Sequence, residues 1–150
     1  MMTKIEKQSG WLDKINDYIA ANEISNTAWS SQGIVYKNGC VANTYTANQI
    51  QYRIIKFGNG LTMLNIVGWV TAPAMKFDEN IVAFTIPTNI SNQVSGFGLL
   101  MGSERNSWGD LLAGYDFNSD TGEFKIHNKN SRDDGSADAS NYMVDYAIIK

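Results

Sequence analysis

Cysteine and proline are scarce in this 150-residue chain, which contains one cysteine, Cys40, and two prolines. A single cysteine excludes an intramolecular disulfide and a zinc cluster built on several cysteines. No run of residues approaches the roughly 18 apolar residues of a membrane-spanning helix. The N-terminal residues are charged and lack the apolar segment of a signal peptide. We therefore expect synthesis in a cytoplasm, without membrane insertion.

Charge is also sparse. Charged residues make up 18% of the sequence, the net charge is -3 and the isoelectric point is about 5.0. Proteins that bind nucleic acid present a basic face that releases counterions from the phosphates. Anionic membrane surfaces attract clusters of basic residues in the same way. The composition therefore predicts that neither nucleic acid nor a membrane surface is a partner.

Catalytic signatures are missing as well. His127 is the only histidine, and the chain has no G-x-S-x-G, H-E-x-x-H, G-x-G-x-x-G or P-loop motif. Residues 116–122 (DFNSDTG) resemble a calcium loop, but Thr121 and His127 stand where an EF-hand has glycine and a bidentate glutamate. We expect a protein that binds rather than catalyses, with no cofactor and no metal.

The N-terminal segment has the pattern of a short amphipathic helix. Its apolar stripe has spacings of seven, three and four residues and consists of Ile5, Leu12, Ile15 and Ile19. Gly10 interrupts the pattern, so we expect the helix to begin near Ser9, the N-cap. Two heptads do not hold a lone helix in water, so the stripe must pack on the chain's own β-domain or on copies of itself. We divide the chain into a helix (1–21), a polar, turn-rich linker (22–33) and a β-domain (34–150).

From residue 34 onward the hydrophobic period is two, which is typical of strands. The predicted strands are 34–37, 40–46, 50–57, 61–70, 81–86, 97–101, 111–117 and 142–149. Turn signals separate them at short intervals, and no helical pattern lies between them. The sequence therefore predicts an all-β fold, an antiparallel β-sandwich or jelly-roll barrel with a short N-terminal amphipathic helix.

Three hairpins are predicted from turn residues. The strongest joins 50–57 to 61–70, and its apolar arms belong near the centre of the fold. Asn38-Gly39 is typical of a type I′ turn and predicts a hairpin between 34–37 and 40–46. In the third hairpin Phe117 pairs with Phe124, which places Tyr115 and Ile126 on the inner face. Asp116 and Lys125 then share the outer face, beside Gly114 and His127.

Residues suited to binding a saccharide are concentrated in the C-terminal half. Sugars are bound by planar aromatic rings, which stack on their C–H faces, and by carboxylates and arginines, which contact hydroxyl pairs. The predicted saccharide-binding residues are Arg105, Trp108 and Asp110 in a polar loop (102–110), Asp116 and His127 on the hairpin, and Arg132 in the loop that follows. In the alternative interpretation Trp108 covers the core and the charges are ordinary loop charges.

The order of these elements resembles the receptor-binding proteins of phages that infect Gram-positive bacteria. The resemblance covers residues 40–150 and is carried by YRIIKFGNGLT (52–62), NIVGWV (65–70), FTIP (84–87) and GEFKI (122–126). It implies a homotrimer of jelly-roll or barrel heads that bind host cell-wall saccharide near the subunit interface. Asp116, His127 and Arg132 correspond in place to the binding residues of that family. The chain departs from the family pattern in lacking an Arg-Pro step after Pro87 and a tryptophan in the closing hairpin.

The resemblance also implies a place in the virion, in a phage tail or baseplate, in contact with other tail subunits. Two alternatives stay open. The chain is a structural accessory tail protein without a glycan site, or, less favoured, a polysaccharide hydrolase that uses its clustered acidic residues.

Overall fold

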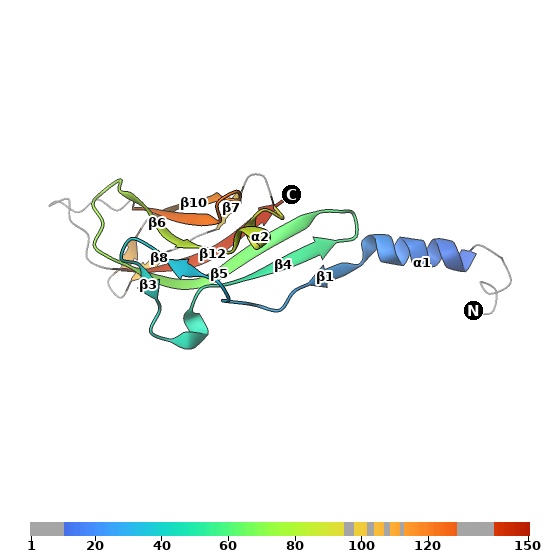
Figure 1. Ribbon diagram of the computed structural model, residues 1–150, viewed down its shortest axis with the longest axis horizontal. Coiled ribbons are helices and arrows are strands. Elements are labelled where there is room, and N and C mark those ends of the chain that lie inside the picture. Colours follow the sequence, from blue (N-terminus) through green and yellow to red (C-terminus); the bar gives the residue numbers. More distant parts are fainter. Residues whose placement is uncertain (1–10, 95–97, 102–103, 107–108, 112, 129–139) are drawn as a thin grey trace.

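Two antiparallel sheets form the body of the protein (Figure 1). The computed structural model describes residues 11–94, 98–101, 104–106, 109–111, 113–128 and 140–150. Sheet A has the strand order β1-β4-β5-β12-β7, with β3 also paired to β5. Its strands are β1 (Ile24–Asn26), β3 (Val41–Ala42), β4 (Gln51–Phe57), β5 (Thr62–Ala72), β7 (Gly98–Met101) and β12 (Ser140–Ile149).

Sheet B has the order β10-β11-β6-β2, and a separate two-stranded sheet holds β8 and β9. The strands of sheet B are β2 (Val35–Tyr36), β6 (Asn80–Thr85), β10 (Ala113–Asn118) and β11 (Glu123–Asn128). The two-stranded sheet consists of β8 (Glu104–Asn106) and β9 (Gly109–Leu111). Short helices are η2 (Thr46–Asn48) and α2 (Thr88–Ser91), and none of the helices in the described residues is long and apolar enough to cross a membrane.

The two sheets pack face to face through an aromatic cluster. Phe124 of β11 stacks on Phe84 of β6, with ring centroids 4.8 Å apart, and meets Tyr146 of β12 edge-on at 5.3 Å. Leu64, Ile66 and Ile148 of sheet A are buried on the same inner side. Alternate residues of each strand thus line one core, as expected of a sandwich. The predicted all-β antiparallel fold is confirmed in its sandwich form.

The β4–β5 hairpin forms the long central ribbon of sheet A. Cross-strand neighbours run from Gln51–Val67 to Lys56–Thr62, and β5 pairs on its other side with β12. Because β5 has a strand on each side, its apolar side chains are buried efficiently, which explains why the arms of this hairpin are apolar in sequence. The prediction of a central β4–β5 hairpin is confirmed.

The β10–β11 hairpin has the predicted register. Phe117 lies opposite Phe124, Tyr115 opposite Ile126, and Asp116 opposite Lys125. The turn is closed by the Asn118 side chain, whose Oδ1 accepts from the backbone N–H groups of Asp120 (2.9 Å) and Thr121 (3.2 Å). An asparagine that bonds its own following backbone is a turn-forming device, so residues 116–122 form a hairpin turn.

The Asn38-Gly39 turn corrects one sequence prediction. Both residues have positive φ, 50° and 78°, and the Cys40 N–H donates to the Lys37 carbonyl at 2.8 Å, as a type I′ turn requires. The flanking strands do not pair with each other, because β2 pairs with β6 and β3 pairs with β5. The predicted hairpin is therefore wrong. The turn carries the chain from sheet B to sheet A, where longer neighbouring strands offer each short strand a partner.

Two segments contain strands where polar connections are predicted. Residues 22–33 include β1, which pairs with β4, and Ser30 exchanges two 2.9 Å backbone hydrogen bonds with Tyr52. The polar loop 102–110 contains β8 and part of β9. All three strands are only three residues long, and such short, largely polar segments give no period-two signal.

The helix α1 (Trp11–Asn22) confirms the predicted N-terminal helix, while Ile5 and Ser9 lie outside the described residues. Figure 1 shows α1 extending beyond the β4–β5 turn, away from both sheets. At its C-terminal end the backbone of Ala21 lies directly against Gly58 of that turn, where a side chain would not fit. Of the stripe residues whose side chains are described, Ile15 is half-buried and Ile19 is 59% exposed, so the sandwich leaves Ile19 open to solvent.

Candidate functional site

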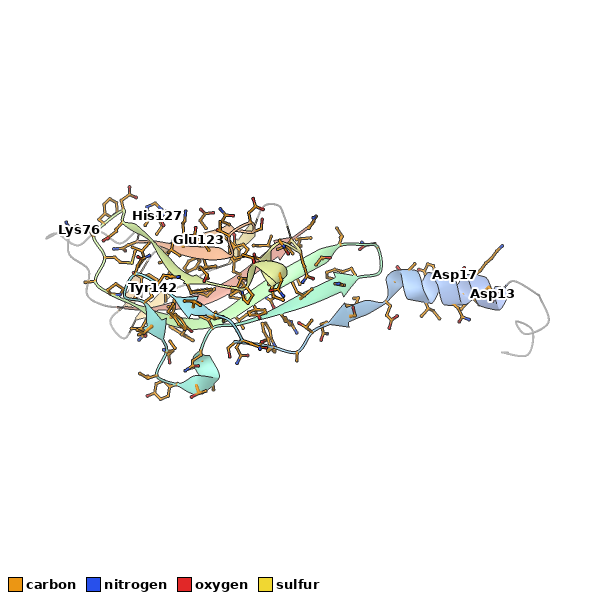
Figure 2. The ribbon with its side chains drawn as sticks, in the orientation of Figure 1. Asp13, Asp17, Lys76, Glu123, His127 and Tyr142 are labelled. Carbon is orange, nitrogen blue, oxygen red and sulfur yellow. The ribbon has the colours of Figure 1, made fainter. Side chains whose placement is uncertain are left out.

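The outer face of sheet B gathers polar side chains at the end of the molecule far from α1. Figure 2 shows His127 and Lys76 near one end and Asp13 and Asp17 of α1 at the other. Alternation along β10 and β11 produces this face, because Tyr115 and Ile126 point into the core and their neighbours point outward. Asp116 is exposed, and His127 is partly exposed.

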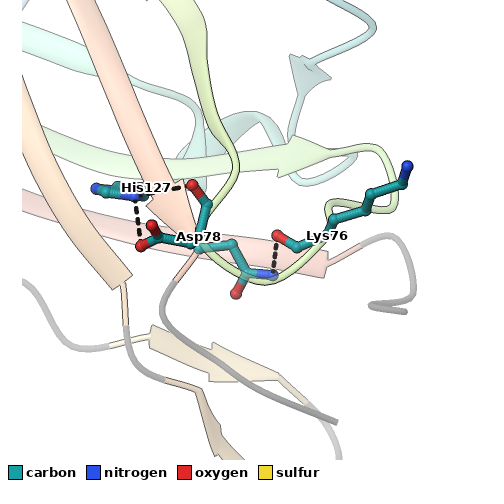
Figure 3. Close-up of polar contacts among 4 residues, drawn as sticks. Lys76, Asp78 and His127 are labelled. Atoms are coloured by element: carbon teal, nitrogen blue, oxygen red, sulfur yellow. Dashed lines mark hydrogen bonds and ion pairs between the residues drawn. The ribbon is translucent and has the colours of Figure 1, made fainter. Parts of the chain in front are cut away.

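His127 is held by Asp78, which lies in the β5–β6 connection (Figure 3). Its Nε2 is 3.0 Å from the Asp78 carboxylate Oδ1 and 3.0 Å from the Asp78 backbone oxygen. Both atoms accept hydrogen bonds, so Nε2 carries the proton and donates to them. In neutral His127 the Nδ1 atom is then an acceptor, able to receive a hydrogen bond from a hydroxyl group.

Buried Asn128 positions this pair. Its Nδ2 donates to the backbone oxygens of Met75 (3.0 Å) and Lys76 (3.1 Å), and its backbone oxygen accepts from the Asp78 N–H at 2.8 Å. Figure 3 shows Lys76 beside the His127–Asp78 pair. Asp78 itself has φ +64°, an uncommon value outside glycine that the surrounding hydrogen bonds maintain. The end of β11 and the β5–β6 connection therefore form one fixed unit.

A shallow groove of about 420 Å³ adjoins His127 on the same sheet. It is lined by Asn38, Asn80, Ile81, Val82 and Lys125. Asn80 lies directly opposite His127 in the strand register, and Val82 lies opposite Lys125. The register shifts at Phe124 and Lys125, a bulge that locally bends the strands.

One wall of the groove is formed by Asn38, which belongs to the turn that connects sheet B to sheet A. Asn38 Nδ2 donates to the Val82 backbone oxygen at 2.9 Å, which fixes the amide at the edge of the groove. The groove thus combines two amides, an ammonium group and a short apolar floor. Its volume lies within the range of small-molecule sites, and amides and ammonium groups are suitable partners for hydroxyls.

Asp116 is the second predicted residue on this face. It lies opposite Lys125, which lines the groove. The pKa of the buried Tyr146 hydroxyl is raised, mainly by burial and further by the Asp116 carboxylate. The negative charge of the Asp116 carboxylate therefore acts on the Tyr146 hydroxyl.

The structure brings together only part of the predicted saccharide site. Asp116 and His127 share the outer face of sheet B, as the alternation predicts. Arg105 and Asp110 are cross-strand partners in the β8–β9 hairpin, and their side chains lie outside the described part of the structure. Trp108 and Arg132 lie outside the described residues altogether.

Several residues of the site are absent from the predicted saccharide-binding set, among them Lys125, Asp78, Asn128, Asn80 and Asn38. Asp78 lies 49 positions from His127, and Asn128, Asn80 and Asn38 belong to three separate segments. Asn38 is recognisable only as a turn residue. Asn128 directly follows His127 in the chain, but Asp78 and Asn80 come close to His127 only through the non-local pairing of β6 with β11.

Comparisons with known proteins add no relative: the chain matches no family model, no curated protein and no solved structure.

Proposed function

We propose that this protein is a receptor-binding protein of a phage tail or baseplate, which adheres to host cell-wall saccharide without cleaving it. The observation that carries the proposal is the polar groove with its adjoining His127–Asp78 pair, at the opposite end of the molecule from α1. An adhesin needs this separation, because one end attaches to the particle while the other meets the cell. The resemblance to phage receptor-binding proteins supports the same function.

The chemistry of the groove suits a neutral or weakly charged sugar. Asn38 and Asn80 supply both donors and acceptors, Lys125 supplies donors, and the Nδ1 atom of neutral His127 supplies an acceptor. Asp116 beside Lys125 adds a carboxylate, which contacts hydroxyl pairs well. In this proposal copies of the chain form a homotrimer, and α1 provides the attachment to other tail subunits.

Retention on purified cell walls tests the function. Walls from a panel of Gram-positive bacteria are incubated with the full chain and with the Asn80→Ala and Lys125→Ala variants, and bound protein is measured after washing. We expect one or more walls to retain the wild type and each variant to bind at least about tenfold more weakly, as expected when a well-placed polar contact is lost. Lys56→Ala, on exposed Lys56 of sheet A, is the matched control and retains binding.

Release of soluble sugar from the same walls distinguishes a hydrolase from an adhesin. The proposal expects none. If no wall retains the protein, or if the groove variants bind like the wild type, the groove is not a saccharide site. A structural accessory tail protein then becomes the better interpretation.

A further inference from the structure

The loop between β3 and β4 carries only neutral side chains and stands out from the sandwich. Its residues 43–49 read NTYTANQ, so six of the seven bear a hydroxyl or amide group and none bears a charge. Figure 1 shows the segment around η2 projecting beyond β3 and β5, away from sheet B. Residues 44–48 are all exposed, and the Tyr45 side chain is 72% exposed. The loop therefore offers water an open aromatic ring surrounded by hydroxyls and amides.

Hydrogen bonds within the loop hold it in one conformation. Asn43 Oδ1 accepts from the Tyr45 N–H at 2.9 Å, and the Tyr45 backbone oxygen accepts from the Asn48 N–H at 2.9 Å. The Gln49 side chain donates from Nε2 to the Asn43 backbone oxygen at 3.2 Å. The Gln49 backbone also lies against Gly68 of β5, where a Cβ atom would come within 2.5 Å of its oxygen. Because the loop is already ordered, a ligand that binds it loses little free energy in ordering it.

Two side chains of sheet A extend the same polar surface. Thr71 of β5 lies opposite Asn141 of β12, and its hydroxyl donates to Asn141 Oδ1 at 2.6 Å. Nδ2 of buried Asn43 lies 3.5 Å from the same oxygen, which joins the loop to the sheet. The neighbouring Ala72 and Tyr142 are buried in the core, so Thr71 and Asn141 point outward. In the described part of the chain Asn141 Nδ2 has no hydrogen-bond acceptor, so it is open to a ligand.

The chemistry of this surface favours a neutral sugar over other ligands. The loop, Thr71 and Asn141 include no charged side chain to pair with an anion or a cation. A protein partner would need a larger apolar centre, whereas the exposed loop residues besides Tyr45 are threonine, alanine and asparagine. A sugar ring presents C–H groups on its face and hydroxyls at its edge. An aromatic ring contacts the face, and amides both donate to and accept from the hydroxyls.

We infer that the 43–49 loop, together with Thr71 and Asn141, is a second saccharide-binding site. Tyr45 stacks on the face of a neutral sugar residue, and the surrounding amides bond its hydroxyls. The inference rests on the proposed function for the source of the sugar, the host cell wall. The loop continues the outer side of sheet A and the groove lies on sheet B, so the two sites are separate. Two weak sites that engage one polysaccharide surface together retain the protein more strongly than either site alone.

Substitution of Tyr45 tests the inference in the same wall-retention assay. We expect Tyr45→Ala to weaken retention by at least about tenfold, because the stacked ring and the second contact are lost. Tyr45→Phe keeps the ring and should stay within about threefold of the wild type. Tyr18→Ala is the matched control, because Tyr18 of α1 is also 72% exposed, and it should be retained like the wild type. Circular dichroism verifies that each variant is folded.

An array of neutral and acidic oligosaccharides, probed with the same proteins, separates the possible outcomes. Binding to neutral glycans that Tyr45→Ala loses and Tyr45→Phe keeps supports the inference. It is overturned if Tyr45→Ala binds every wall and glycan like the wild type, while loss of binding in Asn80→Ala would then leave the groove function standing. Loss in Tyr45→Ala with normal binding by Asn80→Ala and Lys125→Ala would support the loop site and refute the groove. A wild type that binds no wall and no glycan overturns both.

Discussion

Phe124 is the ring through which the two sheets are joined, and its removal provides the sharpest test of the fold. It is fully buried and contacts four other aromatic rings, those of Phe84, Tyr115, Phe117 and Tyr146. Replacing a buried phenylalanine by alanine typically costs about 3–5 kcal/mol of unfolding free energy, because burial is lost and a cavity remains. We take the middle of this range, about 4 kcal/mol. Aromatic pairs each add about 0.5–1.5 kcal/mol beyond burial.

For Phe124→Ala we therefore expect a loss near the upper end, about 5 kcal/mol of unfolding free energy. A domain of this size has about 5–15 kcal/mol in total, so the variant is marginal or unfolded at room temperature. Urea unfolding followed by circular dichroism measures the loss, provided that the slope of unfolding free energy against urea concentration is the same in the variant and the wild type. Phe124→Leu keeps most of the volume and should lose only about 1.5 kcal/mol, which keeps the test quantitative if the alanine variant does not fold.

Phe77→Ala is the control, because Phe77 is 52% exposed and its removal should change stability by about 0.5 kcal/mol or less. A loss below about 1.5 kcal/mol for Phe124→Ala would refute the reasoning. The sheets would then not be held together through this ring, and the packing described above would be wrong.

Four further substitutions test three other features. Gly68→Ala places a Cβ atom 2.5 Å from a backbone oxygen at φ +127°, so we expect it to lose more than about 2 kcal/mol in urea unfolding; Gly60→Ala, at φ +88° with open space around it, should lose about 1 kcal/mol. Burial raises the pKa of the Cys40 thiol from 9.0 to about 11. The unfolded chain therefore loses this proton at lower pH than the folded chain does. Between these two pKa values the free energy of unfolding falls as pH rises, by at most about 1.4 kcal/mol per pH unit. Cys40→Ala should remove that fall between pH 9 and 10, and an unchanged pH profile would contradict the assignment. Asn128→Ala leaves two carbonyls of the β5–β6 connection without their donor and should cost about 2 kcal/mol, detected as a lower urea midpoint; an unchanged midpoint would mean that Asn128 does not fasten this connection.

The proposed site shows where prediction from sequence succeeds and where it stops. Asp116 and His127 are placed on one face by alternation within a single hairpin, which is a local property. The partner that orients His127 is Asp78, which comes from another segment and reaches β11 only because β6 pairs with it. The groove depends on the same pairing and on the turn at Asn38.

The sequence by itself determined the class of fold, the helix, the β10–β11 register and the geometry of the Asn38-Gly39 turn. Each of these depends on residues close together in the chain, through side-chain periodicity or the φ values that asparagine and glycine tolerate. Only the tertiary structure decided that the strands flanking that turn belong to different sheets, and that residues 24–26 form an edge strand. Strand partners are chosen by the burial that a whole sheet achieves, and no short segment contains that information.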